Sequence, residues 1–124
     1  MPTLSPTLTL SQLLDAGPEA FKQFLDEQGP DLMYSSNPEY NTSPLGHYID
    51  CRVLPDTIKI DRTQVSILTA PATDAETLPL PYWAQEYQKK LSDVHEQPYT
   101  FGHIVGDTAL KIYERAEACF PRTA

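Results

Sequence analysis

The sequence of 124 residues has little basic charge, few cysteines and few glycines. Lysine and arginine together number 9 against 17 aspartates and glutamates, which gives a formal net charge of -8. Binding to nucleic acid depends on clustered basic side chains that contact phosphates, so this balance argues against general nucleic-acid binding. It leaves open binding to a basic protein or to a larger complex that contains one, and this is the partner class that the sequence predicts.

Two further absences limit the class of protein. No apolar run approaches the roughly 18 residues of a membrane-spanning helix, and the N-terminus lacks the charged and apolar regions of a secretory signal. The two cysteines, Cys51 and Cys119, are too few for a disulfide framework, and we expect reduced thiols. These features predict a cytoplasmic protein.

Proline and tyrosine are plentiful, with 12 and 7 residues respectively. The proline content is about twice the usual share and predicts short elements joined by stiff corners. Leu, Ile, Val and Phe together exceed the roughly 20 % below which highly charged chains tend to stay disordered, so we expect a folded protein. Residues 1–8 repeat Pro-Thr-Leu and are expected to form a flexible tail, whereas residues 9–120 are expected to form a single domain.

Capping signals predict two short helices at the start of this domain. Thr9 and Gln12 have the spacing of a capping box, in front of apolar residues at helical steps. This first helix is expected to end at Gly17. Pro18 suits the first position of a second helix, which is expected to end at Gly29.

Two further helices are expected in the second half of the chain. Residues 70–81 are rich in proline and read as a linker, and apolar residues then recur at three- and four-residue steps over residues 82–95. Residues 107–120 also present one apolar helical face, and we favour a helix there. An edge strand after a hairpin turn is the alternative.

The clearest strand pattern lies in the middle of the chain. Apolar and polar residues alternate over residues 46–53, 58–60 and 65–67, which predicts a three-stranded antiparallel meander with one solvated face. Residues 31–36 and 99–105 are candidates for one or two added strands. The sequence thus predicts an α+β fold in which a small antiparallel sheet packs against three or four short helices.

Residues capable of catalysis or metal binding show no recognisable spacing. No His-x-His, Cys-x-x-Cys or glycine-rich phosphate-loop pattern occurs. His47 and Cys51 are four residues apart, about 13 Å along a strand, so we do not expect them to share a metal. Asp50 and Cys51 would point to opposite faces of that strand, which argues against a cysteine-histidine mechanism with His103. We predict no catalytic residue, metal or cofactor.

A candidate protein interface lies in the acidic first part of the chain. Residues 1–50 contain seven acidic side chains and one basic side chain, Lys22, a net charge of -6. Tyrosines are common in interface hot spots, and several here are expected in loops or on the polar side of a strand, although each could instead cover its own core. The predicted interface residues are Asp26, Glu27, Asp31, Tyr34, Glu39, Tyr40 and Tyr48.

One family shares the expected layout of a leading helix, a loop of Ser, acid and Tyr, a small sheet and a Gly-acid corner. The residues that carry the likeness are Leu32-Met33-Tyr34-Ser35 with Glu39-Tyr40, and Gly106-Asp107 with Ile112-Tyr113. In these the chain faintly resembles the cyanobacterial nuclease A inhibitors, small acidic proteins that plug a nuclease active site. We carry no site residue over from this resemblance.

Three functions follow as hypotheses. The first is a non-enzymatic protein-binding module, an accessory subunit, regulator or inhibitor, whose acidic, tyrosine-bearing surface steers it onto a basic partner. The second is a nucleic-acid mimic or nuclease inhibitor that occupies a phosphate-binding cleft. The third is a small enzyme or ligand-binding domain with a pocket between sheet and helices, where His103, Tyr99 or Asp50 would act.

Overall fold

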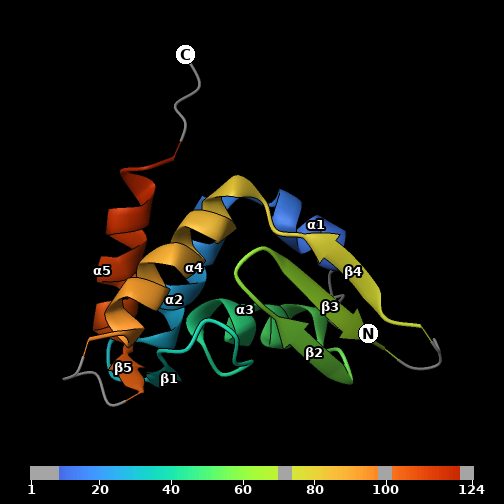
Figure 1. Cartoon of the computed structure of the whole chain (residues 1–124), viewed down its shortest axis with the longest axis horizontal. Coiled ribbons are helices and arrows are strands. Elements are labelled where there is room, and N and C mark those ends of the chain that lie inside the picture. Colours follow the sequence, from blue (N-terminus) through green and yellow to red (C-terminus); the bar gives the residue numbers. More distant parts are fainter. Residues whose placement is uncertain (1–8, 70–73, 98–101, 121–124) are drawn as a thin grey trace, which may run out of the picture.

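The computed structural model describes residues 9–69, 74–97 and 102–120, which form an α+β fold (Figure 1). The expected fold class is confirmed. The described helices are α1 (Leu10–Asp15), α2 (Pro18–Gln28), α3 (Pro44–Val53), α4 (Tyr82–His95) and α5 (Gly106–Glu117). The described strands are β1 (Met33–Ser35), β2 (Thr57–Ile60), β3 (Gln64–Leu68), β4 (Glu76–Pro79) and β5 (His103–Val105). None of these helices is both long and apolar enough to cross a membrane.

The first two helices lie where the capping residues predicted, except that α1 ends at Asp15, two residues before the expected Gly17. The Thr9 hydroxyl accepts from the Gln12 N–H, and the Gln12 side chain accepts from the Thr9 N–H, which completes the capping box. Pro18 is the first residue of α2, and Gly29 follows its end with a φ of 94° that suits glycine. The helices predicted over residues 82–95 and 107–120 are confirmed as α4 and α5. The alternative of a hairpin turn and an edge strand after Gly106 is therefore wrong.

The strand predicted over residues 46–53 is wrong, because this segment is the helix α3. Ser43 caps it by accepting from the Gly46 N–H, and Pro44 occupies its first turn. The buried residues Leu45, Tyr48 and Ile49 recur at three- and four-residue steps, which is the helical period. In such a short segment the same apolar residues fit both the alternation of a strand and the apolar stripe of a helix. The capping residues Ser43 and Pro44 distinguish the two and indicate a helix.

The three-stranded meander exists, but its third strand comes from a different segment. The order is β2–β3–β4, with antiparallel pairing throughout. β4 lies within the expected linker at 70–81, so that prediction is wrong for residues 76–79; residues 70–73 lie outside the described part. The added strands β1 and β5 pair with each other as a separate two-stranded sheet. Residues 1–8 and 98–101, and with them the expected tail and Tyr99, also lie outside the described part.

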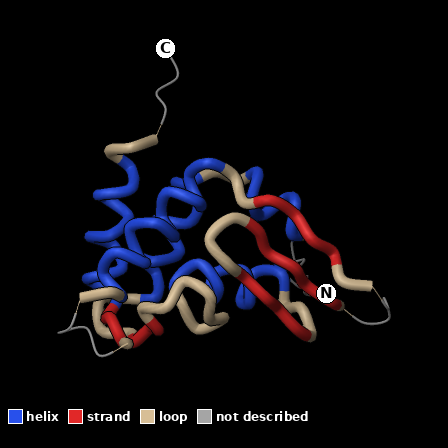
Figure 2. The backbone as a smooth tube through the Cα atoms, in the orientation of Figure 1, coloured by secondary structure: helices blue, strands red, loops and turns tan. Residues whose placement is uncertain are grey.

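The core is organised around Phe21 of α2. Its ring lies 4.8–6.2 Å, centroid to centroid, from four aromatic rings that come from α3, α4 and α5: Tyr48, Trp83, Tyr87 and Tyr113. In Figure 2, α2, α4 and α5 gather at one end of the molecule and the three-stranded sheet lies at the other. The side chains of Ile60, Val65 and Ile67 are buried on the inner side of that sheet.

Replacement of Ile49 by Ala should destabilise the protein. Ile49 is fully buried on α3, so the change leaves a cavity and is expected to cost about 2–5 kcal/mol of unfolding free energy. Urea unfolding of wild type and variant measures this, with Lys59→Ala on an exposed position as the control. A loss below about 0.5 kcal/mol for Ile49→Ala would contradict the assignment of the core face of α3.

Candidate binding groove

The candidate functional site is centred on the loop of residues 36–43, which connects β1 to α3 and is here called the Tyr40 loop. Tyr40 is 57 % exposed although it is a large aromatic residue. The loop folds back through short-range hydrogen bonds: Asn37 Oδ1 accepts from the Glu39 N–H at 3.0 Å, and Asn37 O accepts from the Tyr40 N–H at 3.1 Å. Asparagine is suited to such turns because its side chain replaces a main-chain acceptor.

Helix α4 anchors the Tyr40 loop at two points. The fully buried Gln88 amide donates to Pro38 O at 2.9 Å and to Asp61 O at 3.0 Å. Two turns further on, His95 Nδ1 forms a hydrogen bond of 2.6 Å with the Ser36 hydroxyl. Residues seven apart lie on one face of a helix, so a single face of α4 holds the loop.

Gly46 of α3 lies directly beneath the loop. A Cβ atom at this position would lie 2.8 Å from Tyr40 O and 2.8 Å from Asn41 Cα. Such contacts are far inside the normal van der Waals separation of about 3.5–4.0 Å. The absence of a side chain at Gly46 therefore lets the loop backbone rest on α3.

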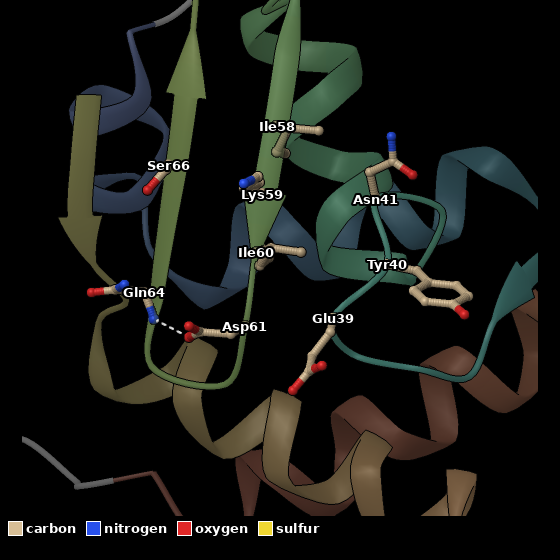
Figure 3. Close-up of a pocket in the computed structure, with 9 residues that line it drawn as sticks. All are labelled: Glu39, Tyr40, Asn41, Ile58, Lys59, Ile60, Asp61, Gln64 and Ser66. Atoms are coloured by element: carbon tan, nitrogen blue, oxygen red, sulfur yellow. Dashed lines mark hydrogen bonds between the residues drawn. The ribbon is translucent and has the colours of Figure 1, made fainter. Parts of the chain in front are cut away.

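Between the Tyr40 loop and the β2–β3 hairpin lies a groove of about 660 Å³, here called the binding groove (Figure 3). In this view β2 has β3 on one side and residues 39–41 of the loop on the other. The lining combines polar and apolar groups: Glu39, Tyr40, Asn41, Ile58, Lys59, Ile60, Asp61, Gln64 and Ser66. Its size suits a few residues of a peptide or a small ligand.

The groove contains two carboxyl groups, Glu39 and Asp61, against one basic side chain, Lys59. Partial burial would raise the pKa of the Asp61 carboxyl, but the N–H groups of Thr63 and Gln64 and the Thr63 hydroxyl donate to it and lower its pKa below the usual value. Asp61 is therefore ionised at neutral pH, and the groove carries a net negative charge.

Tyr40 also lines a second hollow, of about 560 Å³, on the side of β1 and β5. His95 and His103 line it, and so does the exposed Met33. The structure does not bring Asp50 into this hollow, and Tyr99 lies outside the described residues. The Ser36 hydroxyl that bonds His95 belongs to a fully buried residue, so it is not open to a substrate and its bond is structural.

Of the predicted interface residues, the structure brings Glu39 and Tyr40 together in the groove. Tyr34 and Tyr48 are each only 2 % exposed, so the prediction that they lie on the surface is wrong. Tyr34 points inward from β1, where its ring contacts His47, and Tyr48 lies on the core face of α3 beside Phe24.

The other three predicted acids, Asp26, Glu27 and Asp31, are exposed but do not line the groove. Glu27 forms an ion pair of 3.1 Å with Arg52 and lines a different hollow. The sequence did not indicate Asn41 of the Tyr40 loop, the groove residues of the β2–β3 hairpin, or Gln88, which bonds to both walls of the groove. Nothing in the local sequence pattern indicates that Asp61, at the turn between β2 and β3, lines the same groove as Tyr40.

The separation predicted for His47 and Cys51 is also wrong, because both lie on α3. On adjacent helical turns, Cys51 Sγ lies 3.6 Å from His47 Nε2. Burial raises the pKa of the Cys51 thiol and lowers the pKa of His47, so both groups are neutral near pH 7. Across the described ranges no group of three or more potential metal ligands occurs.

The second cysteine, Cys119, is exposed. It follows α5, where the helical stripe that buries Ile112, Tyr113 and Ala116 has already ended. The two thiols are both free.

Comparison with known proteins gives no assignment. No protein-family model matches the chain, and no curated protein or solved structure is significantly similar to it. The likeness to nuclease A inhibitors therefore rests on the few residues quoted above.

Gly46→Ala should displace the Tyr40 loop. The added methyl group collides with backbone atoms rather than with a flexible side chain, so a cost of about 1–3 kcal/mol in unfolding free energy is expected. Amide chemical shifts of residues 39–43 should change more than those of β3. Wild-type stability and unchanged loop shifts would show that the loop does not rest on Gly46.

Thiol labelling should distinguish the two cysteines. Cys119 is exposed, whereas burial raises the Cys51 pKa and leaves less thiolate at a given pH. At pH 8, a disulfide reagent such as Ellman's reagent should modify Cys119 at least about tenfold faster than Cys51. The variants Cys51→Ser and Cys119→Ser assign the two phases; faster labelling in Cys119→Ser than in Cys51→Ser would contradict the neutral Cys51–His47 pair.

Proposed function

We propose that the chain is a non-enzymatic protein-binding module, an accessory, regulatory or inhibitory protein that binds a basic partner through the surface around Tyr40. The observation that carries the proposal is an exposed tyrosine on a firmly anchored loop, between two hollows and beside two carboxylates. Tyrosine combines a large apolar ring with a polar tip, which suits a position at the centre of an interface.

The rigidity of the loop supports binding. Association costs free energy when loops and side chains must become ordered, and a loop already held by Gln88, His95 and its own turns avoids part of that cost. An enzyme would need reactive groups that converge on an open site. In the described part of the chain the Ser36–His95 pair is closed, and the Cys51–His47 pair is neutral.

The charge supports a basic partner, and we place this binding in the cytoplasm, as the sequence predicts. With a net charge of -8, the chain attracts a basic protein over a distance of about one Debye length, roughly 8–10 Å at physiological salt. Glu39 and Asp61 would lie at the contact. Asp26, Glu27 and Asp31 would contribute to the attraction without touching the partner at the groove.

Tyr40→Ala should weaken binding, and Tyr82→Ala should not. The two tyrosines are similarly exposed, at 57 % and 53 %, but Tyr82 begins α4 and lines neither hollow. A partner recovered from native lysate with the wild-type chain, then purified, should bind Tyr40→Ala at least about tenfold more weakly.

The same partner should associate more slowly as salt is raised, because screening removes the attraction between the two charged proteins. Surface-based kinetics over a salt series measure this association rate. A failure to recover a specific partner, an association rate independent of salt, or equal losses for the two tyrosine variants would each contradict the proposed function.

A further inference from the structure

The three-stranded sheet has two edges, and one of them opens on the binding groove. Directly after β2, the Asp61 N–H donates to Gln64 O at 3.0 Å, which fixes the hydrogen-bond pattern of the β2–β3 pair. Antiparallel pairs alternate between hydrogen-bonded and non-hydrogen-bonded positions. The N–H and C=O groups of Ile58 and Ile60 therefore point away from β3. Residues 39–41 of the Tyr40 loop lie on that side of β2 (Figure 3).

These outward groups have no partner among the described residues. No hydrogen bond of the described chain reaches the main-chain N–H or C=O of Ile58 or Ile60 on that side. The Tyr40 loop lies across the groove, and Gln88 ties it to β2 only at the end, through Pro38 O and Asp61 O. Within the described part of the chain, the edge of β2 is thus a short row of donors and acceptors without partners, along the wall of a groove.

The opposite edge of the same sheet is protected. Directly after β4, the Leu80 N–H donates to Thr63 O at 2.8 Å. Within β4, Thr77 and Pro79 are therefore the residues whose main chain points out of the sheet. Pro79 has no N–H to offer. Proline on an edge strand is a common means of preventing the addition of another strand, and β2 has no such residue.

We infer that an extended segment of the basic partner adds to β2 as a fourth strand within the binding groove. The inference rests on the proposed function and specifies its mode of recognition. Up to four main-chain hydrogen bonds would form with Ile58 and Ile60, and side chains of the segment would supply the specificity.

The charges of the groove define the chemistry of the segment. Along an added strand, successive side chains would face opposite sides of the sheet. Apolar side chains would lie beside Ile58, and a Lys or Arg would meet Glu39 near the end of β2, where the ionised Asp61 adds to the negative charge. We therefore expect extended segments with alternating apolar residues and at least one basic residue.

The test uses random dodecapeptides displayed on phage and selected against the full chain, followed by binding of the selected synthetic peptides to variants. Ile58→Pro removes an outward donor, whereas Thr77→Pro makes the same change at an outward position of the protected edge. Ile58→Val controls for the altered side chain. Unfolding in urea confirms that each variant is folded before it is used.

The expected peptides are enriched in Lys and Arg. They should bind Ile58→Pro at least about tenfold more weakly than Thr77→Pro and Ile58→Val, and bind Glu39→Gln more weakly than wild type. If Ile58→Pro does not fold, amide hydrogen exchange of the wild type decides, because bound peptide should slow exchange at Ile58 and Ile60.

The outcomes separate this inference from the proposed function. One outcome overturns strand addition alone: the peptides bind Tyr40→Ala weakly, bind Ile58→Pro as well as wild type, and do not protect the Ile58 and Ile60 amides. The Tyr40 surface would then remain a binding site. If the selected peptides bind Tyr40→Ala and Ile58→Pro as tightly as wild type, both strand addition and the proposed function are overturned. A selection that yields no binding peptide also overturns strand addition.

Discussion

The groove depends on one buried side chain, Gln88. Its amide nitrogen donates to Pro38 O and to Asp61 O, which belong to the two walls of the groove. A buried carbonyl without a donor costs about 1–3 kcal/mol, so the two contacts stabilise this arrangement over one in which the walls separate. The Gln88 Oε1 acceptor is itself buried without a partner among the described residues, a cost that the two donated hydrogen bonds must offset.

Gln88 can act in this way because its neighbour fixes α4 in the core. Tyr87 is completely buried, its ring lies edge-on to Phe21 at 4.8 Å, and its hydroxyl donates to Ala109 O of α5 at 3.1 Å. The core therefore sets the position of α4, and α4 sets the position of the Tyr40 loop. Packing in the helical part of the molecule is in this way connected to a surface at the edge of the sheet.

The sequence was sufficient where a local signal determined the structure and insufficient where partners distant in sequence did. The capping box at Thr9 and the proline and glycine around α2 gave the helix ends, because capping involves only neighbouring residues. Residues 46–53 alternated like a strand, yet Ser43 and Pro44 start a helix there. β4 lacked an apolar pattern because it is a mostly exposed edge strand that owes its existence to pairing with β3.

The binding groove could not be predicted from the sequence, because it too depends on contacts between residues distant in the chain. Glu39 and Tyr40 were recognisable as an exposed acid and tyrosine, but their proximity to Asp61 depends on Gln88, 27 residues further along the chain. Tyr34 and Tyr48 could not be told from Tyr40 by residue type, since whether a tyrosine is buried is decided by the face of β1 or α3 that carries it.

The central claim is that the walls of the groove are held in place before any partner binds. Residue-resolved amide hydrogen exchange of Gln88→Met, compared with wild type, tests it directly, because methionine preserves the size of the side chain but cannot donate to Pro38 O or Asp61 O. We expect exchange at least about tenfold faster for the Tyr40 and Ser43 amides, with the amides between β2 and β3 little changed. Unchanged exchange at Tyr40 and Ser43 would contradict it.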